Sequence, residues 1–179
     1  MKFSKSKLEN IKEIKELFNK TFSDSEGEEE GILIGDLAYD LIKNTNSEDL
    51  FVYNAVENGK IIGSIIFSRL SFEKSQVTAF LLAPVAVHTD YQGRGIGQKL
   101  INYGHDDLKK NGVKLVFTYG DINFYSKVGY NIISEEKVKA PINLSYPEGW
   151  MGQSLLDNEI SLISGNSYCV ETINDPKYW

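Results

Sequence analysis

Hydrophobic residues recur at spacings of three and four near the start of the chain and again after residue 95. The first of these patterns predicts an amphipathic helix over residues 7–22, and a second helix follows it to about Lys43. Ser25 and Glu28, between the two, have the spacing of a capping box, which predicts that the second helix begins there. The chain therefore opens with a pair of helices.

Strand patterns occupy the middle of the chain. Residues 51–70 form two strand-like runs around Asn58–Gly59, and Asn-Gly between such runs is the strongest short-range indication of a β-hairpin. Residues 77–88 form a long apolar run that predicts a central strand. Pro84 lies inside this run and has no N–H to donate, so we expect the strand to carry a bulge or to part from a neighbour there.

Helix and strand patterns then alternate. A helix is expected over residues 96–110 and ends at Asn111–Gly112. The residues expected to share its apolar face are Ile96, Leu100, Tyr103 and Leu108. A strand over 114–119, a short helix and a strand over 130–133 follow, and the tail after Pro141 shows mixed strand and loop patterns. This order predicts one mixed α/β domain spanning residues 1–179.

Composition narrows the classes of function. The net charge of −6 argues against a general nucleic-acid binder, because no basic patch offsets phosphate repulsion. No apolar run reaches the ~18 residues of a membrane span, and the first residues lack the apolar region of a signal peptide. The single cysteine, Cys169, rules out an internal disulfide and is expected to be a buried small residue. We expect a cytoplasmic protein without a metal site, since no cluster of ligands with suitable spacing appears.

Three glycines, Gly93, Gly95 and Gly97, precede the helix expected at residue 96 or lie in its first turn. A glycine loop before a helix leaves N–H groups open to an anion, although a tight turn alone would also explain the glycines. A P-loop is excluded because Gly-Lys-Ser/Thr is missing. The dinucleotide-binding pattern is excluded because Gln98 or Leu100 stands where its third glycine belongs.

The segment Gln92–Gly97 resembles the Gln/Arg-x-x-Gly-x-Gly/Ala motif of the GNAT superfamily of N-acetyltransferases. Two neighbouring segments strengthen this resemblance. Pro84–Val87 is similar to the end of the family's central strand, and Phe124–Tyr130 is similar to its aromatic-Tyr-x-x-x-Gly-aromatic segment. The resemblance extends from about residue 50 to residue 133.

The resemblance implies a GNAT-like fold: a mostly antiparallel, twisted sheet of six to seven strands with a splayed central pair, flanked by helices. It also implies acetyl-CoA as co-substrate, without a metal, bound by a core at about residues 77–133. The residues implied to bind acetyl-CoA are Val85, Ala86, Val87, Gln92, Gly93, Arg94, Gly95, Ile96, Gly97, Gln98, Asn123 and Tyr125.

In the family, a strand N–H at the position of Val87 polarises the thioester, and a tyrosine at the position of Tyr125 protonates the departing thiolate. A phenol with a pKa near ~10 is protonated at neutral pH and can donate a proton. The competing interpretation of Tyr125 is a core aromatic residue. Many family members have an asparagine where this chain has Thr118. Asn123 is therefore the candidate for that contact, whereas Asp121 is expected to cap the short helix.

No general base emerges from the sequence. His88 is expected in a turn and His105 at the surface of its helix. The acidic residues between the first two helices are Glu26, Glu28, Glu29 and Glu30. They form either a solvated helix start or an attractive surface for a cationic amine. The sequence thus favours an N-acetyltransferase that acts on an amine of a small molecule or a protein, as a monomer or homodimer. A non-catalytic acyl-CoA-binding module is the alternative.

Overall fold

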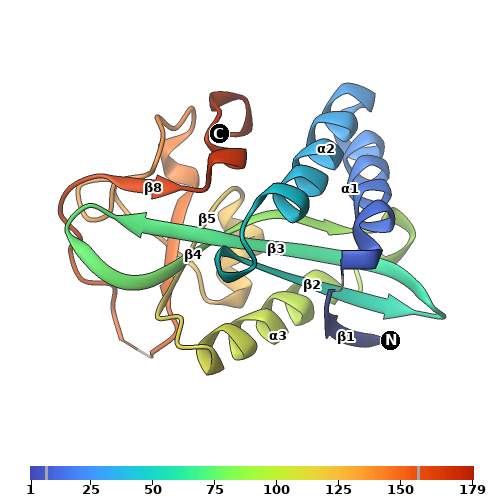
Figure 1. Ribbon diagram of the computed structural model, residues 1–179, viewed down its shortest axis with the longest axis horizontal. Coiled ribbons are helices and arrows are strands. Elements are labelled where there is room, and N and C mark those ends of the chain that lie inside the picture. Colours follow the sequence, from blue (N-terminus) through green and yellow to red (C-terminus); the bar gives the residue numbers. More distant parts are fainter. Residues whose placement is uncertain (7, 157) are drawn as a thin grey trace. The chain divides into compact units, whose positions relative to one another are not determined.

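Eight strands of the described residues pair into one sheet in the structure, a computed structural model that describes residues 1–6, 8–156 and 158–179 (Figure 1). The elements are β1 (Lys2–Lys5), α1 (Ile11–Glu26), α2 (Glu28–Asn44), β2 (Leu50–Glu57), β3 (Lys60–Phe72), β4 (Ser75–Val87), α3 (Ile96–Lys110), β5 (Leu115–Tyr119), α4 (Ile122–Tyr125), β6 (Asn131–Ile132), β7 (Trp150–Ser154) and β8 (Ser167–Cys169).

The strand order is β1-β2-β3-β4-β5-β7-β6, and β8 pairs with β3. β4 and β5 are parallel, whereas β1–β2, β3–β8, β5–β7 and β6–β7 are antiparallel. The predicted mixed α/β class and mostly antiparallel sheet are confirmed. The described residues form eight strands rather than the six to seven expected, because β1 and β8 are too short to show a pattern of their own.

The backbone groups into two compact units. Unit 1 comprises Met1–Phe67 with Pro84–Gly104, and unit 2 comprises Ser68–Ala83 with His105–Trp179. β3, β4 and α3 each contribute residues to both units.

In unit 1, α1 and α2 pack side by side (Figure 1). Glycine makes this close contact possible. A Cβ at Gly31 would overlap the Ser23 hydroxyl and the Asn19 carbonyl, and one at Gly35 would lie 3.0 Å from the Asn19 side chain. The opposite face of α1 supplies fully buried residues such as Ile14 and Phe18 to the core.

The boundary between α1 and α2 differs from the prediction. α1 continues through Glu26, and Gly27, with φ of 104°, separates it from α2 without a side-chain cap. Ser25 lies within the last turn of α1, where its hydroxyl donates to the Thr21 carbonyl at 3.2 Å. The capping-box prediction for Ser25 and Glu28 is wrong, because the left-handed Gly27 makes the break one residue before Glu28.

The predicted hairpin is confirmed, because Asn58 and Gly59 have φ values of 50° and 76° between β2 and β3. Two positive φ angles define the turn whose twist matches the flanking strands. The first strand, β1, was not predicted, and it pairs with residues 53–56 of β2. The helix expected over 7–22 is α1, which begins at Ile11 after a 3₁₀ turn at Leu8–Asn10; Lys7 lies outside the described residues.

The structure confirms the predicted bounds of α3, although its apolar face is arranged differently. Ile96, Leu100 and Leu108 are buried, whereas Tyr103 is 37% exposed. The Tyr103 ring packs against Phe3 and Tyr53, with ring centroids 5.8 Å apart in both pairs. Tyr103 therefore lies at the border of the apolar face rather than on it.

Unit 2 has an aromatic core built partly from the tail. Phe117 on β5 stacks on Trp150, with their ring centroids 5.4 Å apart. The ring centroid of Trp179 lies 6.3 Å from that of Trp150 and 5.9 Å from that of Tyr119. Trp150 is fully buried, and its indole N–H donates to the Val138 carbonyl at 2.9 Å. The tail therefore contributes core residues and two strands.

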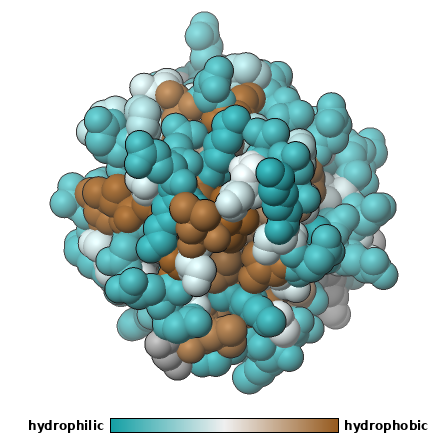
Figure 2. All heavy atoms as spheres, turned by 90° about the vertical axis from the view of Figure 1, so that its left-hand side faces the viewer, coloured by the Kyte–Doolittle hydropathy of each residue, from teal (hydrophilic) through white to brown (hydrophobic). Residues whose placement is uncertain are grey.

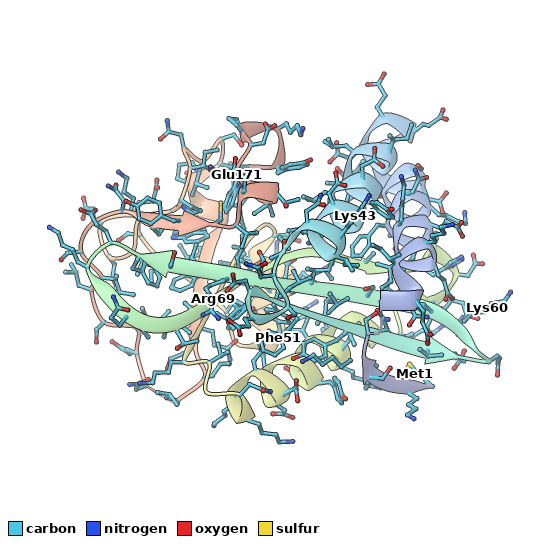
Figure 3. All side chains as sticks on the ribbon, viewed as in Figure 1. Met1, Lys43, Phe51, Lys60, Arg69 and Glu171 are labelled. Carbon is cyan, nitrogen blue, oxygen red and sulfur yellow. The ribbon has the colours of Figure 1, made fainter. Side chains whose placement is uncertain are left out.

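The surface is mixed in character. Arg69, labelled on β3 in Figure 3, holds its guanidinium 4.9 Å from the centre of the Phe80 ring, a cation–π geometry. Figure 2 shows one face on which hydrophobic groups are interspersed with hydrophilic residues. Exposed apolar side chains include Leu162 and Tyr168. No helix in the described part of the chain is long and apolar enough to cross a membrane.

Candidate active site

The end of β4 presents backbone groups along one edge. β3 and β4 are neighbours joined by Glu73–Lys74 and are therefore antiparallel, and His88 donates its N–H to the Ile62 carbonyl at 2.9 Å. Backbone groups alternate between the two edges of a strand, so those of Ala86 and His88 point toward β3. In agreement, the Ala86 carbonyl lies 3.4 Å from a Cβ built on Gly63 of β3. The N–H and C=O groups of Val85 and Val87 consequently point away from β3.

Pro84 lies just before this edge. β4 pairs in parallel with β5 from Ala79 to Leu82, and it continues as a strand through Pro84 to Val87 beyond that register. Proline cannot donate a ladder hydrogen bond, which suits a position past the end of a pairing. The splay of the central strands at this point stays a prediction.

Val87 is tied to the loop that follows it. Gln92 donates its side-chain N–H to the Val87 carbonyl at 2.9 Å, and the Thr21 hydroxyl of α1 donates to the same oxygen at 3.5 Å. Gln92 thus holds the loop against the strand. Both of these hydrogen bonds end on the Val87 carbonyl. The Val87 N–H and the N–H and C=O groups of Val85, which also point away from β3, take no part in them.

The glycine loop has a conformation that only glycine adopts readily. Gly93 and Gly95 have φ values of 74° and 72°. A Cβ on Gly93 would meet nothing within 4 Å, and one on Gly95 would meet only the Gln98 side chain, at 3.7 Å. Gly97 is instead buried in the first turn of α3. The protein thus leaves space above Gly93 and Gly95, whereas Gly97 belongs to the packed helix start.

The start of α3 offers donors at this space. α3 begins at Ile96, and the first hydrogen bond of this helix runs from the Lys99 N–H to the Gly95 carbonyl, at 3.1 Å. The N–H groups of the preceding residues have no acceptor within the helix, and the macrodipole adds about half a positive charge. Arg94 is exposed, donates to the Asp90 carbonyl at 2.9 Å and lies over the Tyr91 ring. This arrangement is suited to binding a phosphate or pyrophosphate.

Tyr125 closes the short helix α4 in unit 2. Asp121 caps this helix as predicted, because its carboxylate accepts the Asn123 backbone N–H at 2.9 Å. The Asn123 side-chain amide also donates to that carboxylate at 2.9 Å. Asn123 is therefore engaged with Asp121, and its role as a cofactor contact stays a prediction.

The Tyr125 side chain is half-buried. Burial raises the pKa of Tyr125 above its usual range; a hydrogen bond with Thr118 lowers this pKa and the Asp121 charge raises it. Thr118, which stands where many relatives have asparagine, is fully buried and donates its hydroxyl to the Leu82 carbonyl at 2.9 Å. Tyr125 is thus held as a neutral phenol at physiological pH, the form that can give up a proton.

His105 is buried, and its predicted surface position is wrong. It is 7% exposed, and its Nε2 lies 3.1 Å from the Tyr130 hydroxyl. Burial lowers the pKa of His105 to about 4, so the imidazole is neutral near pH 7. The spacing did contain an indication, because His105 follows the buried Ile101 by four residues and precedes the buried Leu108 by three.

The remaining titratable candidates are His88, Cys169 and the acidic residues at the start of α2. His88 caps the turn at Thr89–Tyr91, as expected, by accepting the Asp90 N–H at 3.3 Å. Cys169 is half-buried rather than buried, and burial raises its pKa to about 11. Glu28 and Glu29 are exposed in the first turn of α2, where acidic residues favour the helix dipole. Among the described residues, no group of three or more His, Cys, Asp or Glu side chains could hold a metal ion.

Several known proteins with sequences or folds similar to this chain are acetyltransferases. A family model described as an acetyltransferase (GNAT) domain matches residues 46–132. The structure of the GNAT family N-acetyltransferase YhbS from Escherichia coli, in complex with CoA, is similar with a TM-score of 0.83, at 22% identity over 97% of this chain and 92% of that chain. A GNAT family acetyltransferase from Brucella melitensis, in complex with acetyl-CoA, gives 0.75, at 20% identity over 97% of each chain. These structures establish the shared fold.

A further relative is more similar to this chain in sequence than these two structures are. The uncharacterized N-acetyltransferase YjhQ from Escherichia coli (strain K12) is 30% identical in an alignment of 141 residues that covers 76% of this chain and 77% of YjhQ. On the strength of that match, together with the matching family model and fold, this chain belongs to the GNAT family of N-acetyltransferases.

Proposed function

We propose that the protein transfers the acetyl group of acetyl-CoA directly to a primary amine of a small molecule or protein. The observation that carries this proposal is the succession of backbone donors in unit 1. The outward-facing groups of Val85 and Val87 are followed by the open space above Gly93 and Gly95 and by the start of α3. Coenzyme A offers matching chemistry, because its pantetheine arm is an extended chain of amides and its pyrophosphate is an anion.

Each part of the molecule has a role in this proposal. The pantetheine amides form hydrogen bonds with the backbone of Val85, as an added strand would. The pyrophosphate accepts hydrogen bonds from the N–H groups of the loop and of the first turn of α3. Ala86 and Ile96 are buried and support this backbone from below. Gln92 acts indirectly by fixing the loop to Val87.

The chemical step needs a neutral amine, which forms when the ammonium group of the acceptor loses a proton to water or a base. Its nitrogen then attacks the thioester carbon, and the Val87 N–H stabilises the charge that develops on the oxygen. The carbon–sulfur bond breaks and the thiolate takes the Tyr125 proton. The attacking nitrogen gives up its second proton to water, and water returns a proton to the Tyr125 phenolate. Tyr125 suits this role because its phenol, whose pKa is raised by burial, is protonated near pH 7 and can donate.

Gly95→Ala, compared with Gly112→Ala, tests the donor site. Both glycines have positive φ, 72° and 80°, and neither added methyl group meets a protein atom closer than 3.7 Å. Both variants therefore pay a similar cost in stability, about 1 kcal/mol, but only Gly95→Ala should weaken acetyl-CoA binding in calorimetry. Equal affinity for the two variants would remove the phosphate site from this loop.

Tyr125→Phe tests the chemistry. We expect turnover, measured as thiol release with a panel of amines, to fall at least tenfold, whereas the affinity for acetyl-CoA should change little. Unchanged turnover would exclude Tyr125 as the acid. Binding of acetyl-CoA without thiol release for any amine would instead favour a non-catalytic acyl-CoA-binding module.

A further inference from the structure

Tyr125 is enclosed on several sides by residues of unit 2. A Cβ on Gly120 would lie 3.0 Å from Cε2 of the Tyr125 ring, so the ring rests directly on the Gly120 backbone. The Phe124 and Tyr130 rings meet it edge-to-face, at 5.0 and 5.7 Å between centroids. The Tyr125 backbone is also fixed, since its N–H donates to the Asp121 carbonyl at 3.1 Å and its carbonyl accepts the Tyr130 N–H at 3.3 Å.

Tyr130 is itself held in place. It is 1% exposed, and its hydroxyl lies 3.1 Å from His105 Nε2, on a helix that is distant in sequence. The two rings are 5.4 Å apart. A buried phenol hydroxyl needs a partner, and His105 supplies one from the rigid frame of α3. The Tyr130 ring is thereby anchored to a long helix, whereas α4 itself is only four residues long.

We propose that Tyr130, anchored by His105, is a positioning residue that holds the Tyr125 ring against Gly120 in the orientation required for proton transfer. The inference rests on the proposed role of Tyr125 as the acid. An acid must lie within hydrogen-bond reach of the departing sulfur, and small displacements of a catalytic group lower turnover steeply. Tyr130 and His105 do not touch the reacting atoms in this proposal; they restrict the motion of the residue that does.

Three substitutions separate the ring contact from the hydroxyl contact. Tyr130→Leu removes the aromatic edge against Tyr125 and should lower kcat about three- to tenfold while the KM for acetyl-CoA stays within twofold. Tyr130→Phe keeps that edge but loses the hydrogen bond to His105, so its kcat should lie between those of the parent and Tyr130→Leu. Gly120→Ala places a methyl group 3.0 Å from the Tyr125 ring and should lower kcat in the same way.

The decisive comparison repeats Tyr130→Leu in a Tyr125→Phe background. If Tyr130 acts through the Tyr125 hydroxyl, the second substitution should change kcat little once that hydroxyl is gone. An equal loss of kcat in both backgrounds would overturn the proposal, because the effect would then be a general disturbance of the fold.

A measurement independent of turnover guards against failure of the acid role. In protein carrying ¹³C-labelled tyrosine rings, the Tyr125 signals are assigned by their loss in Tyr125→Phe. Tyr130→Leu should accelerate flipping of the Tyr125 ring, and Tyr130→Phe, which loses only the bond to His105, should do so to a smaller extent. Ring flipping unaffected by Tyr130→Leu would refute positioning whatever the kinetics show. If Tyr125→Phe keeps full turnover while Tyr130→Leu still accelerates flipping of the Tyr125 ring, the acid role is refuted but the positioning contact is not.

Discussion

His105 should make the stability of the protein depend on pH in a way that one substitution removes. Its pKa is about 4 in the folded protein and 6.5 in its ordinary state, so between these values the unfolded chain binds a proton that the folded chain does not. Stability is therefore at its full value above about pH 6.5 and falls as the pH drops toward 4. At 1.36 kcal/mol per pKa unit, the total loss is about 3 kcal/mol, of which about 2 kcal/mol has occurred by pH 5.

The test compares the parent protein with His105→Gln, whose amide can still bond to the Tyr130 hydroxyl but does not titrate. Urea unfolding followed by far-UV circular dichroism, at about pH 7.5 and pH 5, gives the free energy of unfolding of each protein. The parent should lose about 2 kcal/mol more than the variant over this interval. Asp24 and Asp175, whose pKa values are lowered by hydrogen bonds with Thr89 and with the Lys177 N–H, are present in both proteins and cancel in the difference. Equal losses in the two proteins would refute the buried, neutral state of His105.

Three further substitutions test other parts of the structure. Gly31→Ala should lower the free energy of unfolding by about 1–3 kcal/mol, because the new methyl group overlaps Ser23 and forces α1 and α2 apart. Glu29→Ala, at an exposed position of α2, is the control. Equal melting temperatures of the two variants would contradict this packing. Asp121→Ala should cost about 1 kcal/mol in urea unfolding through loss of the α4 cap, and Asp121→Asn should recover most of it if the cap is the cause. Gln92→Leu should weaken acetyl-CoA binding about three- to tenfold in calorimetry by releasing the loop from Val87, and an unchanged Kd would show that this hydrogen bond does not shape the site.

The features predicted correctly from the sequence are those that local chemistry determines. The α3 bounds follow from the hydrophobic period, the glycines before the helix and the Asn-Gly after it, all within the segment itself. The β2–β3 hairpin follows in the same way from Asn58 and Gly59, whose positive φ angles few other pairs adopt. In both cases the determining residues are close neighbours in sequence.

The features that were missed depend on partners distant in sequence. β1 exists because β2 offers it an edge about fifty residues later, and four residues of mixed character show no period by themselves. His105 can be buried because Tyr130, which is distant in sequence, shares a hydrogen bond with it. The site shows the same limit: the sequence identifies Gln92 and Asn123 as candidates, but it does not indicate that their amides bond to Val87 and Asp121.

The two tryptophans of the chain, Trp150 and Trp179, both belong to unit 2 and share one aromatic cluster. Intrinsic tryptophan fluorescence is therefore a natural probe of that unit alone. The long helices α1 and α2 lie entirely in unit 1 and contribute strongly to the helical circular dichroism signal. Following both signals through one denaturant titration would show whether the units lose structure together, since coincident curves indicate a single cooperative transition and separated curves indicate two. The placement of two indole rings thus gives the protein a built-in reporter of its own cooperativity.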